Sequence, residues 1–136
     1  MTRYMLDTNV IGALVKDHHG VTQKIITAPI NSLCISAITE GEICFGLAIR
    51  PDAKKLHRLV REVLLHVDVL PWNHEVSQQY AALRAELERT GKRPGKQPGP
   101  IDILIAAHAL QLGAVLVTSE RAFKYVRNLA VEDWTA

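Results

Sequence analysis

Apolar residues along the chain follow two patterns. Some form short continuous runs, and others recur every three or four residues over longer stretches. Short runs between turn residues predict buried strands, and the longer periodic stretches predict helices. The predicted strands cover residues 4–6, 32–36, 67–70, 114–117 and 129–131. The predicted helices cover residues 10–15, 18–28, 39–48, 52–67, 73–90, 101–112 and 121–125.

The order of these elements predicts the fold class, because helices separate the successive strands. Strands joined in this way run parallel, and helices cover both faces of the sheet. We therefore expect an α/β fold, with a central parallel sheet of four to five short strands flanked by helices on both faces. The 136 residues contain no repeat or interdomain linker, so we expect one domain over residues 1–136.

The composition indicates the cellular compartment to expect and argues against a zinc site. The chain is 48% hydrophobic, but no apolar run reaches the roughly 18 residues that span a membrane. The amino terminus leads directly into a predicted strand, so we expect a cytoplasmic protein without a signal peptide and without membrane contact. Cys34 and Cys44 lack the spacing of zinc ligands, and we expect two buried thiols.

Acidic residues stand where the predicted sheet would bring them together. Asp7 ends the first strand, Glu42 lies on the helix after the second, and Asp102 begins the apolar helix 101–112. Glu120 follows the strand at 114–117. Ligands of parallel sheets bind at the carboxyl edge of the strands, so we expect these side chains to meet there. Carboxylates without Cys or His select a hard divalent ion, Mg²⁺ or Mn²⁺.

Each of these acids also has a simpler structural interpretation. Asp7 or Asn9 can cap the helix that follows the first strand. Asp102, just after Pro100, can cap its own helix or complement the helix dipole. Glu120 can be a surface acid of little consequence. The residues considered one at a time leave these alternatives open.

Four stretches together carry a family resemblance. They are MLDTN at residues 5–9, SAITEGEICFG at 36–46, GPIDILIAAHA at 99–109 and VLVTSERAF at 115–123. In this order they resemble the PIN-domain ribonucleases, and most closely the VapC toxins of bacterial toxin–antitoxin pairs.

The resemblance implies metal-binding and catalytic roles for particular acids. Asp7, Glu42 and Asp102 match the family's acidic positions. Glu120 stands where the family usually has Asp or Asn, one methylene longer. Glu40 competes with Glu42, but residues two apart on a helix point about 200° apart, so only one of the pair can face the site. The expected supporting residues are Asn9, which would hold a metal-bound carboxylate, and Thr118 and Ser119, which could contribute hydroxyls.

The resemblance also implies an activity and partners. It predicts an Mg²⁺- or Mn²⁺-dependent endoribonuclease that forms a homodimer and cuts RNA, with tRNA as the expected substrate. It further predicts neutralisation by a VapB-type antitoxin, in a groove formed by the helices at 10–28 and 39–48.

The loop at residues 91–100 has two interpretations. Lys92, Arg93 and Lys96 lie close in sequence to Asp102, and they could hold RNA phosphates beside the metal. A solvated loop is an equal alternative. Three other side chains are expected to serve packing: His108 as a core histidine bonded to backbone, and Trp72 and Trp134 near the ends of the sheet.

Two other functions are alternatives to a ribonuclease. A phosphatase of the haloacid-dehalogenase kind also has an Asp after its first strand, but it needs a second Asp two residues later. Asn9 occupies that place here, which argues against this function. A catalytically silent binding module on a PIN scaffold is a further alternative, although all the main acids are present.

Overall fold

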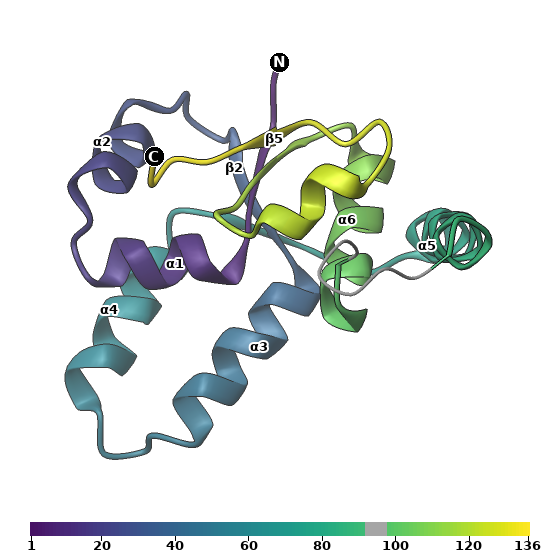
Figure 1. Ribbon diagram of the computed structural model, residues 1–136. Helices are drawn as coiled ribbons and strands as arrows, with labels where there is room; N and C mark the ends of the chain where they lie inside the picture. The colour runs from purple at the N-terminus through teal and green to yellow at the C-terminus, as the bar shows by residue number, and fades with distance from the viewer. Residues whose placement is uncertain (92–97) are drawn as a thin grey trace.

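The computed structural model describes residues 1–91 and 98–136. In this part of the chain, helices and strands alternate largely as predicted (Figure 1). In chain order the elements are β1 (Tyr4–Leu6), α1 (Thr8–Val15), α2 (His19–Thr27), β2 (Leu33–Ser36), α3 (Ala37–Ala48), α4 (Lys54–Leu64), β3 (Asp68–Leu70), α5 (His74–Arg89), α6 (Pro100–Leu112), β4 (Val115–Val117), the 3₁₀ helix η1 (Arg121–Tyr125) and β5 (Val131–Glu132).

The strands of the described residues form one parallel sheet of five, in the order β3-β2-β1-β4-β5. The first strand lies at the centre, where Met5 pairs with Cys34 of β2 on one side and with Leu116 of β4 on the other. Every pair of neighbours is joined through at least one helix or 3₁₀ helix, as a parallel sheet requires. The predicted α/β fold class is therefore confirmed.

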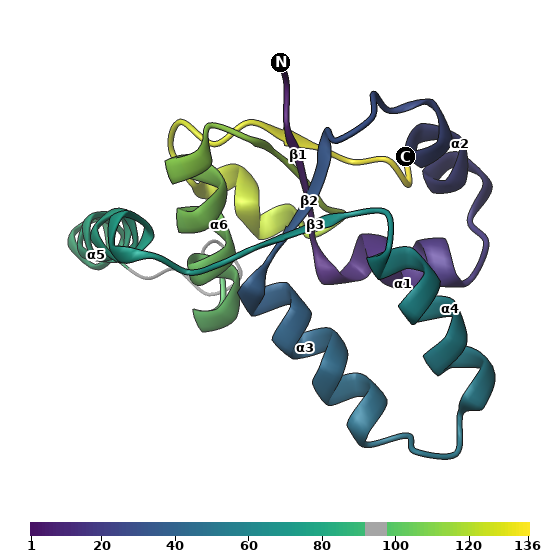
Figure 2. The same cartoon turned by 180° about the vertical axis from the view of Figure 1, so that it is seen from behind.

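Side chains of the central strands alternate between two hydrophobic cores, because successive residues of a strand point to opposite faces. Met5 belongs to the core that contains residues of α5 and α6, whereas Leu6 belongs to the core that contains residues of α1, α2 and α4. Cys34 and Ile35 divide in the same way. The two helical layers on opposite sides of the sheet are visible in Figures 1 and 2.

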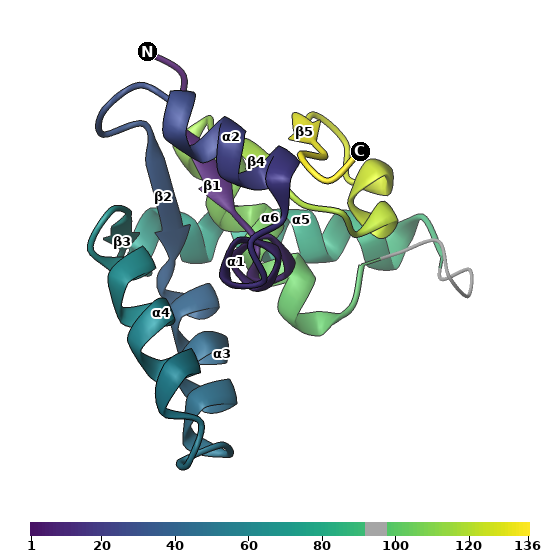
Figure 3. The same cartoon turned by 90° about the vertical axis from the view of Figure 1, so that its left-hand side faces the viewer.

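Helix α3 starts directly at the carboxyl end of β2. The hydroxyl of Ser36 accepts a hydrogen bond from the backbone N–H of Ile38 at 3.1 Å and so caps the helix. From this point α3 and then α4 extend beyond the carboxyl edge of the sheet as a helical hairpin (Figure 3). Residues of α3 consequently lie beside the sheet edge at which Asp7 ends β1.

The projection of α3 also corrects the prediction for the cysteines. Cys34 is buried in β2 as expected, but Cys44 is exposed. Cys44 occupies a turn of α3 where one side of the helix has no layer over it, so the expectation of two buried thiols was wrong for this residue.

Among the described residues, no helix has both the length and the apolar character needed to cross a membrane.

The final strand was placed too early in the sequence. It covers Val131–Glu132, not residues 129–131. Asn128 adopts a left-handed backbone conformation, with φ of 67°, and turns the chain before the strand begins. Leu129 is apolar because it packs against the core from this turn, which explains why the apolar run was mistaken for a strand.

Helix α6 forms as predicted and carries Asp102 in its first turn. Pro100 occupies its beginning, where a missing N–H costs nothing. Gly113 ends it in the left-handed conformation, with φ of 71°. Residues 105–109 are all buried, whereas Ile101 in the first turn is exposed.

Candidate active site

Asp7 lies at the carboxyl end of the central strand and is 4% exposed. Its backbone N–H donates to the carbonyl of Val117 at 2.9 Å, which fixes it against β4. Its Oδ1 accepts from the N–H of Thr8 at 2.8 Å. Its Oδ2 accepts from the Thr118 hydroxyl at 2.8 Å and from the Asn9 amide at 3.2 Å. Four hydrogen bonds, three of them to its carboxylate, thus fix Asp7 between the ends of β1 and β4.

This geometry bears on the simpler interpretation that Asp7 only caps α1. Asp7 does occupy the capping position. A capping carboxylate usually accepts from the second or third N–H of its helix, whereas Asp7 accepts from the first, that of Thr8. Its other oxygen accepts from Thr118, which directly follows β4. Burial raises the pKa of Asp7, and the charge of Glu120 adds to this, while the hydrogen bonds lower it.

Thr118 and Asn9 link the ends of β1 and β4. The hydroxyl of Thr118 donates to Asp7 and accepts from the Asn9 amide at 3.1 Å and from the N–H of Glu120 at 3.0 Å. The Asn9 carbonyl oxygen accepts from the N–H of Ser119 at 3.2 Å. The network contains the predicted hydroxyl of Thr118, whereas the contribution of Ser119 to it comes from the backbone. Asn9 holds the Asp7 carboxylate as expected.

Glu42 reaches the same edge from α3. It is half-buried, and its Oε1 accepts from the Thr8 hydroxyl at 3.1 Å. Glu42 also raises the pKa of Asp102 through its charge. These contacts with Thr8 and Asp102 place Glu42, the member of the pair that the resemblance favours over Glu40, at the candidate site. Sequence reasoning missed Thr8, although it lies inside the MLDTN stretch.

Asp102 shows most directly that the acids share one environment. Its pKa is raised to about 6, first by burial and then by the negative charges of Asp7, Glu120 and Glu42, in that order. A hydrogen bond from the backbone of Gly99 opposes the shift. That bond is typical of an acid in the first turn that reaches back to its helix start. Asp102 therefore bonds to the start of its own helix and also lies within electrostatic range of the other acids.

Glu120 has a double position. It is exposed, and its Oε1 accepts from the N–H of Ala122 at 3.1 Å, so it caps η1. Its charge nevertheless contributes to the raised pKa of both Asp7 and Asp102. The structure thus places Glu120 at the surface, as the simpler interpretation predicted, and gives it a capping role that was not predicted. It also places Glu120 within electrostatic range of the site.

The donor set fits a hydrated divalent ion better than a fully enclosed one. Within residues 1–91 and 98–136, no three His, Cys, Asp or Glu side chains converge into a ready-made coordination cluster. Mg²⁺ usually keeps several waters and uses only one or two carboxylates directly. Asp7 and Asp102 offer oxygen ligands, and the raised pKa of Asp102 marks an excess of negative charge that a cation would relieve.

Several predicted residues lie elsewhere. Lys92, Arg93 and Lys96 fall outside the described residues. His108 is a core residue as expected, but its partner is the side chain of Ser36 at 2.7 Å and not a backbone group. Trp134 is buried and contacts Tyr4, and Trp72 contacts Tyr80, so the packing role expected of both tryptophans is confirmed.

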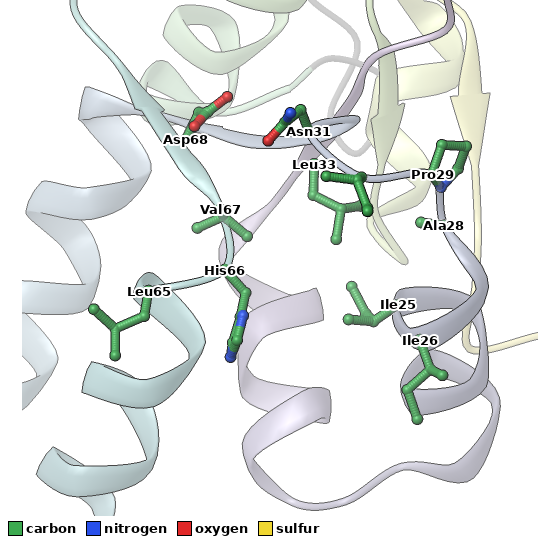
Figure 4. Close-up of a pocket in the computed structure, with 11 residues that line it drawn as sticks. Ile25, Ile26, Ala28, Pro29, Asn31, Leu33, Leu65, His66, Val67 and Asp68 are labelled. Carbon is green, nitrogen blue, oxygen red and sulfur yellow. The ribbon is translucent and has the colours of Figure 1, made fainter.

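A pocket of about 480 Å³ lies at the opposite, amino edge of the sheet. It is lined by Ile25 and Ile26 of α2 and by Leu65, His66 and Val67 after α4 (Figure 4). A neighbouring pocket of about 270 Å³ shares part of this lining. It adds residues from the end of α1 and from α4, including Leu14, Val15, Leu59 and Val63. Helix α3 does not line either of these two pockets, and the groove expected from sequence, between the helices at 10–28 and 39–48, stays a prediction.

Comparisons with known proteins agree with this geometry. Residues 4–129 match the family model described as PIN domain. The chain is 30% identical over 136 residues to the tRNA(fMet)-specific endonuclease VapC of Shigella flexneri, covering 99% of this chain and 100% of that relative. It is 31% identical over 135 residues to ribonuclease VapC1 of Haemophilus influenzae strain R2866, covering 97% and 98%.

Solved structures lead to the same family. The crystal structure of DNA-bound VapBC from Salmonella typhimurium matches with a TM-score of 0.86 and 29% identity, over 98% of this chain and 99% of that chain. VapBC-1 from nontypeable Haemophilus influenzae matches with a TM-score of 0.84 and 28% identity, over 99% and 100%. With the acids gathered at the carboxyl edge of the sheet, these matches show that the chain belongs to the PIN-domain family, among the VapC ribonucleases.

Proposed function

We propose that this chain is a metal-dependent endoribonuclease that hydrolyses RNA phosphodiester bonds at the edge where Asp7, Glu42 and Asp102 gather. The observation that carries the proposal is the convergence of acids from four separate segments of the chain. Thr8 donates to Asp7 and Glu42, and the Thr118 hydroxyl bonds both Asp7 and the backbone of Glu120. Burial and the charges of these three acids raise the pKa of Asp102 to about 6, which agrees with this convergence. A divalent cation bound in this region would relieve the repulsion among these acids.

The chain's own residues prepare this region for phosphodiester chemistry. Thr8 and Thr118 donate hydrogen bonds that fix the two oxygens of Asp7. Thr8 also orients Glu42. When bound among these acids, Mg²⁺ or Mn²⁺ would lower the pKa of a water molecule and stabilise the leaving oxygen. Fixed carboxylates matter because catalysis depends on placing the reacting groups before the reaction starts.

The proposed substrate is tRNA, cut to leave a 5′-phosphate and a 3′-hydroxyl. Two relatives, from Shigella flexneri and Salmonella typhimurium, are named tRNA(fMet)-specific endonucleases. Cleavage of tRNA would stop translation, which is the action of a toxin in the cytoplasm. Lys92, Arg93 and Lys96 are proposed to contact RNA phosphates near the site.

A VapB-type antitoxin is the proposed partner. Several structural neighbours with at least 25% identity are VapBC complexes. The groove between α1, α2 and α4 offers an apolar surface, with Ile26 and Leu65 exposed at 69% and 78%. An amphipathic helix of the antitoxin would fit such a groove. Changing Ile25 to Asp should weaken neutralisation while RNA cleavage persists.

We also propose that the chain forms a homodimer, which sedimentation of the purified chain would test.

The proposed function is tested by mapping cleavage. Purified chain is incubated with total RNA in Mn²⁺, in Mg²⁺ and in excess EDTA, and the new 5′ ends are sequenced. We expect cuts at a few tRNA positions in both metals and none in EDTA. Equal cleavage in EDTA would contradict metal dependence, and cuts outside tRNA would contradict the proposed substrate. No cleavage under any condition would favour the binding-module alternative.

A further inference from the structure

A buried histidine joins the two helices that carry Glu42 and Asp102. His108 of α6 is 3% exposed, and its Nδ1 lies 2.7 Å from the hydroxyl of Ser36. The same hydroxyl accepts the N–H of Ile38 and so caps α3. The ring of Trp72 packs edge-on against the histidine at 5.9 Å. The contact between His108 and Ser36 is therefore held by packing and by the start of α3.

The contact between His108 and Ser36 is separated from each of the two acids by the same number of residues. Glu42 follows Ser36 by six residues on α3, and Asp102 precedes His108 by six residues on α6. Six residues of helix correspond to about 9 Å along the axis. A tilt of about 10° at the contact would therefore move a carboxylate by about 1.6 Å. A misplacement of about 1 Å can reduce catalysis about a hundredfold.

The acids themselves push these helices apart. Glu42 lies on α3 and Asp102 on α6, and like charges on the two helices repel. The repulsion acts between α3 and α6 whenever no cation lies between them. The short hydrogen bond between His108 and Ser36 in the core resists this separation, and burial lowers the pKa of His108, which favours its neutral ring.

We propose that His108 is a positioning residue, whose hydrogen bond to Ser36 sets the separation of Glu42 and Asp102 and so the affinity for the divalent ion. This inference rests on the proposed metal-dependent function. It assigns no contact between His108 and the substrate or the ion. Its effect passes through Ser36 to α3 and through α6 to Asp102.

The test measures Mn²⁺ binding directly, by calorimetry of the metal-free protein, alongside the melting temperature. His108→Leu keeps much of the volume but removes the bond to Ser36, and we expect the dissociation constant for Mn²⁺ to rise about tenfold. His108→Asn can place a polar atom near the Nδ1 position, and we expect binding within about twofold of the parent. Ser36→Ala removes the same bond from the other side and should reproduce the loss.

A control separates positioning from general loss of stability. Ile105→Val removes one methylene from a fully buried residue of the same helix but keeps the bond between His108 and Ser36. It should lower the melting temperature and leave Mn²⁺ binding unchanged. If His108→Leu binds Mn²⁺ as the parent does, the inference is overturned while the proposed function stands. If Ile105→Val weakens binding as much as His108→Leu, positioning is also refuted. A parent that binds no Mn²⁺ would overturn both.

Discussion

Thr8 donates its hydroxyl to Glu42 across 3.1 Å and joins two segments that lie 34 residues apart in the chain. Its backbone N–H donates at the same time to Asp7. One residue therefore orients two carboxylates that come from different elements, β1 and α3. Replacing a group that holds a metal ligand in place typically costs about 10- to 100-fold in metal affinity or activity.

Thr8→Val is expected to weaken metal binding and cleavage about tenfold, because it keeps the shape but removes the hydroxyl that orients Glu42. Its backbone bond to Asp7 remains. The measurement is Mn²⁺ titration of RNA cleavage under single-turnover conditions. Thr8→Ser keeps the hydroxyl and is the control, with activity within about twofold of the parent. Equal loss in both variants would show that the methyl packing matters and the hydroxyl does not.

The raised pKa of Asp102 predicts how stability depends on pH. The folded state binds this proton more tightly than the unfolded chain, whose ordinary value is 3.8. Asp102 therefore favours folding fully below about 3.8, and this contribution is lost as the pH rises through about 6. Asp102→Asn, which is always neutral, should raise the melting temperature of metal-free protein at pH 7.5. Solvent screening of this half-buried group limits the gain to about 3 °C, from about 1 kcal/mol.

The gain from Asp102→Asn should shrink as the pH is lowered from 7.5 to 4.5, because the parent then becomes neutral at this position as well. The comparison is made in EDTA, by thermal unfolding of both proteins at each pH. Because His108 is present in both proteins, its titration affects both melting temperatures and cancels in the difference between them. A gain that does not change with pH, or a loss at pH 7.5, would contradict the raised pKa.

Glu120 should show a graded effect, since it caps η1 and reaches the other acids only through its charge. Glu120→Ala is expected to weaken metal affinity and slow cleavage less than Asp7→Ala or Asp102→Ala does. Glu120→Asp should be tolerated, because it preserves the charge. Metal titration of the three alanine variants decides the matter. If Glu120→Ala binds metal and cleaves like the parent, Glu120 belongs to the surface and the site has three acids.

The basic residues Lys92, Arg93 and Lys96 carry a prediction from sequence. Replacing all three with Ala should weaken RNA binding and reduce the slope of log affinity against log salt by about 2, since each phosphate contact in a single strand contributes about 0.7. Metal affinity should stay the same. RNA binding is measured by fluorescence anisotropy at several salt concentrations. An unchanged slope would mean that these residues do not contact phosphates.

Much of the fold was predictable from sequence because it depends on local patterns. The short apolar runs at β1 and β2 and the all-round apolar α6 each have a single good explanation in a parallel sheet covered by helices. The error at β5 arose where Leu129 packs from a turn and imitates a strand. The exposure of Cys44 was not predictable, because it depends on how far α3 projects from the sheet.

The site was predictable for the residues whose chemistry is visible, such as Asp7 and Asp102. The supporting contacts were harder, because they join distant segments through ordinary residues. Nothing in its neighbours marks Thr8 as the donor to Glu42, and nothing around Ser36 shows that His108 will reach it 72 residues later. Such contacts follow from the crossing of helices, which a single sequence does not specify.

We propose that Asp7 binds the metal and does not only cap α1. Asp7→Asn keeps the size and one acceptor oxygen but removes the charge, and its NH2 group replaces an oxygen that now accepts hydrogen bonds. Removing a buried charge offsets this loss, because burial already raises the pKa of Asp7, so the melting temperature should be nearly unchanged. Mn²⁺-dependent RNA cleavage should fall at least about a hundredfold. Asp52→Asn, at an exposed acid in the turn before α4, is the matched control and should cleave like the parent. A folded Asp7→Asn protein that cleaves RNA at the parent rate would contradict the metal site.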